Sequence, residues 1–173
     1  MSKRLIPFVA AAAFALSLVG ATPAQAQQSP AKGVGLGVAA GVNLYDEEAI
    51  DLGTSFAWGF FVDIPLLDTF YITPAAMIYE LDMGDLGKAS ITDIDLNFKF
   101  IVPIGSLRLG VGILAGLTTG LGDYEGHFGG LAYVGWNLVS NLDLFAMLQY
   151  KRLSTGEMTI DNYHGYAGTM FRF

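Results

Sequence analysis

The amino-acid sequence predicts an all-β fold, an eight-stranded antiparallel up-and-down barrel that spans a membrane. Eight segments alternate apolar residues with small or polar ones, which is the period of a β-strand. The connections between these segments alternate between short turns and longer acidic loops, as expected for an antiparallel barrel that crosses a membrane. Although 53% of residues are hydrophobic, no apolar run after residue 26 approaches the 18 residues that indicate a membrane helix.

Residues 1–26 are expected to form a cleaved signal peptide. Lys3 and Arg4 form a charged start, residues 5–19 form an apolar segment, and Ala24-Gln25-Ala26 is a small-x-small cleavage site. The alternative is a transmembrane anchor. That alternative is disfavoured because the apolar run is short for a bilayer core of about 30 Å and a cleavage signal follows it directly. Residues 27–173 then form one exported barrel domain.

The first half of the barrel contains the clearest strand patterns. The first strand has six apolar residues in step from Val34 to Leu44, and the second alternates aromatic with small residues. The third contains Pro74, which cannot donate to a sheet ladder, so a bulge or irregularity is expected there. In the fourth, a charged and amide face from Asp93 to Lys99 lies opposite an apolar face. These four strands are expected at residues 33–45, 54–65, 69–81 and 90–103.

The second half repeats the pattern. The fifth and sixth strands alternate aliphatic residues with glycine, and the seventh alternates from Leu142 to Lys151. The last strand has one mostly apolar and one mixed face, and it ends on an aromatic residue. These strands are expected at residues 107–118, 126–139, 142–153 and 163–173. The longer loops are expected at residues 46–53, 82–89, 120–125 and 154–159, and the short turns at 66–68, 103–106 and 140–141.

The apolar face of each strand is predicted to point outward, toward lipid. The other face is rich in glycine and alanine, which suits the narrow interior of an eight-stranded barrel. Aromatic residues gather at the strand ends, as in the interfacial girdles of membrane barrels. They are Trp58, Phe70, Trp136, Tyr150, Tyr163 and Phe173. The alternative is a secreted soluble barrel that turns its apolar face inward and binds a ligand.

Charged side chains are predicted at two heights inside the barrel. A lower group lies near the short turns or the carboxyl end: Asp63, Arg108, Asp143 and Arg172. A higher group is Asp95, Lys99 and Lys151. Two Asp and two Arg at one level favour a paired plug, because buried charge is tolerated only with partners. An ion path is the alternative, but an eight-stranded interior is only wide enough for its own side chains.

Several classes of site are excluded or disfavoured by composition. The chain has no cysteine, so disulfides and thiolate metal sites are excluded. Removing Lys3 and Arg4 leaves seven basic against 16 acidic residues, and such a surface repels nucleic acid. The acidic loops carry oxygen ligands suited to Ca²⁺ or Mg²⁺, but no calcium-loop spacing is present, so a solvated rim is expected. No cofactor is expected either.

The terminal strand carries a resemblance to a known family. With Tyr163, Phe171 and a final Phe173 on an eight-strand pattern, the sequence resembles the small bacterial outer-membrane β-barrels, a porin-like group that includes the OmpX, Ail and OmpA-type membrane domains. The resemblance implies a monomer in the outer-membrane lipid of a Gram-negative cell, with both termini periplasmic. It also implies that the last strand is an assembly signal for periplasmic chaperones and the barrel assembly machinery.

The function expected from the resemblance is non-enzymatic, a structural or surface-interaction role through short acidic extracellular loops. A narrow channel for small or apolar solutes and a lipid A-modifying enzyme are the alternatives. The lipid A deacylases carry a Ser two positions after their His. In this chain the residue two positions after His127 is Gly129, and the residue two positions after His164 is Tyr166. The nucleophile is therefore missing. His127 is expected at a loop end and His164 in the interior.

Overall fold

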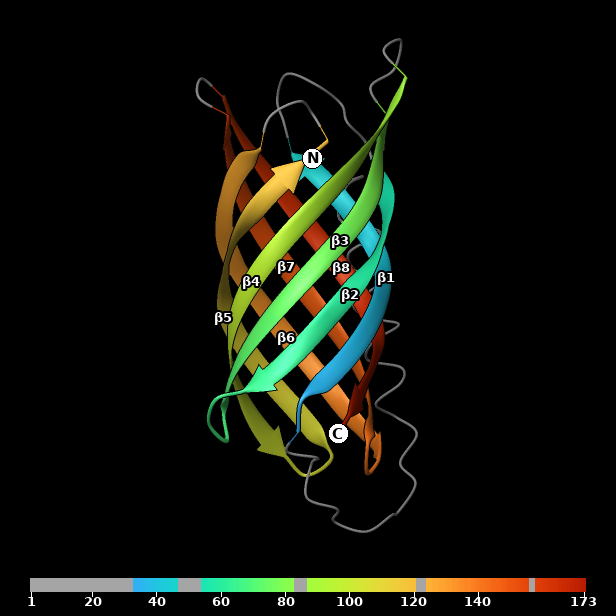
Figure 1. Ribbon diagram of the computed structural model, residues 1–173, viewed down its shortest axis with the longest axis vertical. Coiled ribbons are helices and arrows are strands. Elements are labelled where there is room, and N and C mark those ends of the chain that lie inside the picture. Colours follow the sequence, from blue (N-terminus) through green and yellow to red (C-terminus); the bar gives the residue numbers. More distant parts are fainter. Residues whose placement is uncertain (1–32, 47–53, 83–86, 121–123, 156–157) are drawn as a thin grey trace, which may run out of the picture.

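A computed structural model describes residues 33–46, 54–82, 87–120, 124–155 and 158–173 as a closed barrel (Figure 1). Each strand is antiparallel to its neighbours, and the eight-stranded up-and-down fold predicted from the sequence is confirmed. The strands are β1 (Gly35–Asp46), β2 (Thr54–Pro65), β3 (Phe70–Asp82), β4 (Lys88–Ile104), β5 (Leu107–Thr119), β6 (Glu125–Val139), β7 (Leu142–Thr155) and β8 (Met158–Arg172). In the described ranges no helix has the length and hydropathy to cross a membrane.

The barrel closes between its first and last strands. The ladder of β1 and β8 runs without a register shift from Gly35–Arg172 to Asp46–Asp161. This pairing satisfies the backbone groups that would otherwise form two open edges, a requirement for any sheet in lipid. It also places the start of β1 and the end of β8 at the same end of the barrel as the three short turns (Figure 1).

The connection between β7 and β8 is shorter than predicted. The expected loop at 154–159 is wrong, because only residues 156 and 157 separate the two strands. Leu153 pairs with Ile160 and Ser154 with Thr159, so serine and threonine residues that are typical of loops continue the ladder here. The longer connections are therefore only three: residues 47–53, 83–87 and 120–124. The expected loops lie largely outside the described residues.

Pro74 interrupts one ladder without shifting its register. Phe61 pairs with Ala75 and Ile64 with Ile72, but the two pairs between them are missing. The expected irregularity is therefore present as a local break rather than a bulge, since proline has no N–H to donate. A true register shift occurs between Asn137 and Val139, which the sequence did not predict.

The two faces of the wall point as predicted. Apolar side chains such as Phe60 and Ile113 are 52% and 67% exposed on the outer face, while their sequence neighbours are turned inward. An exposed apolar band of this kind around a whole barrel is stable only in contact with lipid, since soluble proteins rarely expose contiguous apolar patches of such size.

The interior is filled in layers, which the inward side chains of β7 show in order. Asp143 near the short-turn end is followed by Phe145, Met147, Gln149 and Lys151 toward the other end, all buried. The apolar middle layer is completed from other strands. The ring of Phe61 lies 5.5 Å from that of Phe145 and 6.4 Å from that of Tyr166. An apolar layer therefore separates two charged layers.

Candidate functional site

The lower charged layer is built around Asp63 and Arg172. Arg172 donates from Nε to Asp143 (2.6 Å) and from Nη2 to Asp63 (2.9 Å), so one guanidinium joins two carboxylates. Lys99 Nζ donates to the other oxygen of Asp63 at 2.6 Å, and Arg108 Nη1 donates to Asp143 at 3.1 Å. The five side chains come from β2, β4, β5, β7 and β8, and all are buried. Buried charges on five strands therefore meet in one network of charge-assisted hydrogen bonds.

Neutral groups complete the lower layer, which we call the lower cluster. Thr73 donates to Asp63 at 2.6 Å, and Asn137 donates to Asp143 at 2.8 Å. Lys99 Nζ lies 4.7 Å from the centre of the Tyr133 ring, a distance at which a cation is attracted by the ring face. The carboxylates thus accept from neutral donors as well as from cations.

The upper charged layer, the upper cluster, is built around Lys151. Its Nζ donates to Asp93 and to Asp95, at 2.8 Å in each case. His127 Nε2 lies 2.6 Å from Asp95, and Thr118 donates to Asp93 at 2.7 Å. All five side chains are buried. One ammonium therefore compensates two carboxylates, with polar neighbours taking the remaining acceptor sites.

The two clusters balance each other in charge. Among the described residues, the buried Asp side chains number four and the buried Lys and Arg side chains also number four. The lower cluster holds three of the cations against two carboxylates, and the upper cluster holds one cation against two. Counting only Asp, Lys and Arg, the buried side chains carry no net charge, which lowers the cost of burying so many charged groups.

The structure brings together the four residues predicted near the short turns, Asp63, Arg108, Asp143 and Arg172. Lys99 was predicted in the higher group and instead joins this lower set. The prediction counted residues from the turns, and that count ignores the reach of the flexible four-carbon stem of lysine. Asp95 and Lys151 do meet in the upper cluster.

Asp93 and His127 belong to the upper cluster but were not among the site residues predicted from the sequence. Asp93 shares the inward face of Asp95, so the alternation of β4 was sufficient to include it. His127 lies at the loop end of β6, as expected, and its ring is buried there in contact with Thr118 and Asp95. His164 is in the interior as expected, and it contacts the hydroxyl of Tyr166.

The contacts of His127 resemble a catalytic relay in outline. Thr118 Oγ1 lies 2.9 Å from His127 Nδ1, and Asp95 lies 2.6 Å from Nε2, which gives a hydroxyl, an imidazole and a carboxylate in sequence. The hydroxyl of Thr118, however, donates to Asp93, and the residue as a whole is only 2% exposed. A nucleophile must reach substrate, so this arrangement is one of packing. In the described part of the chain no cluster of three or more potential metal ligands occurs.

The predicted girdle and terminal residues lie on the outer face. Phe70 contacts Phe100 and Tyr150 contacts Tyr163, with ring centres 5.2 and 5.3 Å apart. Trp58 is exposed and Trp136 is half-buried. Phe171 and Phe173 contact each other at 5.0 Å. The N–H of Phe173 donates to the Val34 carbonyl at 3.0 Å. Their roles as a girdle and an assembly signal remain predictions.

Gly116 provides the space in which His127 meets Asp95. A Cβ at this position would lie 2.6 Å from His127 Nε2, 2.8 Å from Asp95 Oδ1 and 2.3 Å from the Ile94 carbonyl oxygen. We therefore expect Gly116→Ala to destabilise the barrel by about 1–3 kcal/mol through overpacking. The measurement is urea-induced unfolding of the barrel in lipid vesicles.

Gly130→Ala is the matched control for this change. A Cβ there would meet only the Gly112 carbonyl oxygen, at an ordinary 3.6 Å. Its effect is expected within about 0.5 kcal/mol, as for surface changes in general. Equal stability of the two variants would contradict the tight fit at Gly116.

Comparison with known proteins places the fold. A scan against protein families and a search of curated proteins each found no match. The crystal structure of Neisserial surface protein A (NspA), from Neisseria, has a TM-score of 0.68 at 13% identity and covers 82% of this chain and 98% of that one. The outer membrane protein OprG of Pseudomonas aeruginosa has a TM-score of 0.53 at 13% identity, covering 83% and 98%. The chain therefore has the fold of the small outer-membrane β-barrels.

Proposed function

We propose that the protein is a non-enzymatic outer-membrane β-barrel whose interior is closed by its charged clusters. The lipid-compatible outer face and the fold support the location. The observation that carries the closed interior is the sequence of layers along β7. Two networks of paired charge lie on either side of an apolar layer containing Phe61, Phe145 and Met147. An ion crossing this layer would lose its hydration without gaining a partner.

The proposed role is structural or surface-interacting, through the connections at the end opposite the short turns. In the orientation we propose, both termini and the short turns face the periplasm and the acidic connections face outward, as the three longer connections at that end support. The ladder between β1 and β8 closes the barrel and pairs its first and last strands with each other, which supports a monomer. We also propose that assembly proceeds through the terminal strand and the barrel assembly machinery.

The closed interior predicts that the protein does not conduct ions. Refolded protein inserted in planar lipid bilayers is expected to show no steady single-channel conductance. Heat-modifiable migration of the same sample in detergent gels provides the control, since it shows that the protein is folded. Reproducible conductance steps from folded protein would overturn the closed interior and favour a narrow channel.

A further inference from the structure

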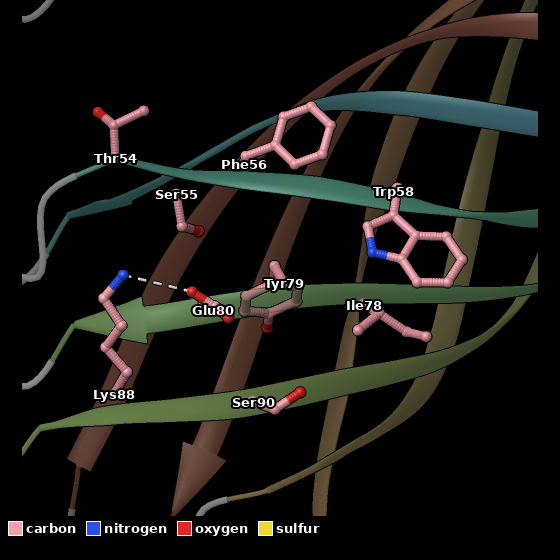
Figure 2. Close-up of a pocket in the computed structure, with 9 residues that line it drawn as sticks. All are labelled: Thr54, Ser55, Phe56, Trp58, Ile78, Tyr79, Glu80, Lys88 and Ser90. Atoms are coloured by element: carbon pink, nitrogen blue, oxygen red, sulfur yellow. Dashed lines mark hydrogen bonds and ion pairs between the residues drawn. The ribbon is translucent and has the colours of Figure 1, made fainter.

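The wall of the barrel is open between β2 and β3 near their loop ends. Their ladder stops at Ala57–Tyr79, although β2 begins at Thr54 and β3 continues to Asp82. The adjacent ladder between β3 and β4, by contrast, continues to Asp82–Lys88. Figure 2 shows β2 and β3 diverging toward this end. Three positions on each strand therefore face each other without sheet pairing.

A pocket of about 580 Å³ lies at this opening. Phe56, Trp58 and Ile78 line it from the outer face, and Ser55 and Tyr79 line it from the inner face (Figure 2). Side chains from both faces of a strand line one pocket only where the wall is open. The volume is within the range of about 300–1,000 Å³ that is typical of small-molecule sites.

Ser55 lines this pocket and carries a buried polar group without a hydrogen-bond partner in the described part of the chain. Its side chain is 9% exposed, and Oγ has no hydrogen-bond partner among the described residues. The same is true of Asn43 Nδ2, directly opposite Ser55 on β1, and of His164 Nε2, directly opposite Asn43 on β8. A buried polar atom without a partner is costly. A ligand with a hydrogen-bonding group at Ser55 would remove part of that cost.

The charges around the pocket are already compensated. At its rim Lys88 Nζ lies 3.4 Å from Glu80, the pair drawn in Figure 2. On the inner side the Tyr79 hydroxyl donates to Asp93 at 3.2 Å, and Asp93 is held by Lys151. A charged group entering the pocket would therefore compete with an existing pair. An uncharged head with hydroxyl groups fits these surroundings better.

The pocket does not lead into the barrel. The inward positions next to it are Ala57 and Gly59 on β2 and Met77 on β3, and all are buried. A Cβ at Gly59 would already lie 2.4 Å from Met77 Sδ. Phe61 fills the next inward position on β2. The opening is therefore suited to binding at the wall rather than to passage through the interior.

We propose that this opening binds a single-chain amphiphile drawn from the surrounding membrane. Its uncharged, hydroxyl-bearing head lies against Ser55, and its hydrocarbon chain lies along Phe56, Trp58 and Ile78. Indole rings prefer the boundary between head groups and hydrocarbon, so Trp58 marks the height at which such a molecule changes from polar to apolar. This site is independent of the closed interior, because it requires only that the outer wall contact lipid.

The test uses the small number of tryptophans. The chain has two, so Trp136→Phe leaves Trp58 as the single tryptophan, which is excited selectively at long wavelength. The probe is a glycerol monoester of a dibrominated fatty acid, whose bromines quench tryptophan on contact, titrated into the refolded barrel in lipid vesicles. We expect saturable quenching. Ser55→Ala in the same background is expected to weaken binding about five- to tenfold, the equivalent of one hydrogen bond.

Controls separate the site from ordinary lipid contact. Ser106→Ala removes an exposed hydroxyl at the short-turn end and is expected to leave the affinity unchanged. Ser55→Thr keeps the hydroxyl and is expected to retain binding, and heat-modifiable migration shows that each variant is folded. Non-saturable quenching, or equal affinity in the Ser55→Ala and Ser106→Ala variants, would overturn the site. Tighter binding of the brominated fatty acid or alkylamine than of the glycerol ester would overturn the uncharged head.

Discussion

Replacing Lys151 with methionine is expected to lower the free energy of unfolding of the barrel by about 3–5 kcal/mol, the cost of breaking a buried ion pair. Lys151 Nζ donates to Asp93 and Asp95 at 2.8 Å each, and all three side chains are buried. Without it, neither carboxylate has a Lys or Arg partner among the described residues. Urea-induced unfolding in lipid vesicles, followed by fluorescence and by gel migration, measures the loss.

Two further variants identify the cause of that loss. Lys88→Met removes an exposed lysine that lies 3.4 Å from Glu80, and its effect is expected to stay within about 1 kcal/mol. In the upper cluster, Asp93→Asn combined with Lys151→Met leaves one buried carboxylate, whereas Lys151→Met alone leaves two. The double variant should therefore be more stable than Lys151→Met alone. The double-mutant cycle gives the coupling between the two residues. A Lys151→Met variant as stable as Lys88→Met would show that the upper cluster does not stabilise the barrel.

Most of the fold was predictable because each strand faces two different environments. In β4 the alternation of Asp93, Asp95, Asn97 and Lys99 with aromatic and aliphatic residues shows the strand and its outward face together. The prediction failed where polar residues continue a strand. Ser154 and Thr159 pair across the end of β7 and β8, and the sequence alone does not show that pairing.

The sequence predicted which charged residues face the interior, but it was less informative about which of them contact each other. Period two placed the charged residues inside, yet it carries no information on how far a side chain reaches. Lys99 therefore appeared to belong with Lys151, whereas its Nζ contacts Asp63, a residue 36 positions earlier in the chain. The opening between β2 and β3 had no sequence signal at all. It arises from the absence of pairing between two regular strands, and local pattern does not report on pairing.

The balance of charge between the layers gives the interior a directional arrangement. Counting only Asp, Lys and Arg, the lower cluster has one cation in excess and the upper cluster one carboxylate in excess, and the apolar layer separates them. In a medium of low dielectric constant, opposite excess charges attract across such a layer. A substitution that removes a carboxylate from the lower cluster therefore has two costs. It leaves a cation of the lower cluster without its carboxylate partner, and it makes the net charge of the interior more positive.

Asp63→Asn is the substitution that tests this arrangement, and it is expected to destabilise the barrel by about 3–5 kcal/mol. Asp63 accepts from Lys99 at 2.6 Å and from Arg172 at 2.9 Å, and it is the carboxylate that the structure pairs with Lys99. Asparagine has nearly the same shape, so the loss reports on charge rather than on packing. Arg172 retains Asp143 at 2.6 Å, whereas Lys99 is left with the ring of Tyr133.

The control for Asp63→Asn is the same change on the outer face. Asp161 pairs with Arg152 at 2.9 Å in a partly exposed position, so Asp161→Asn is expected to cost about 1 kcal/mol or less. Adding Lys99→Met to Asp63→Asn removes the orphaned ammonium and restores the original net charge. This double variant should therefore be more stable than Asp63→Asn alone. If Lys99→Met gives no recovery, the cost of Asp63→Asn lies in lost hydrogen bonds from Thr73 and Arg172 and not in uncompensated charge.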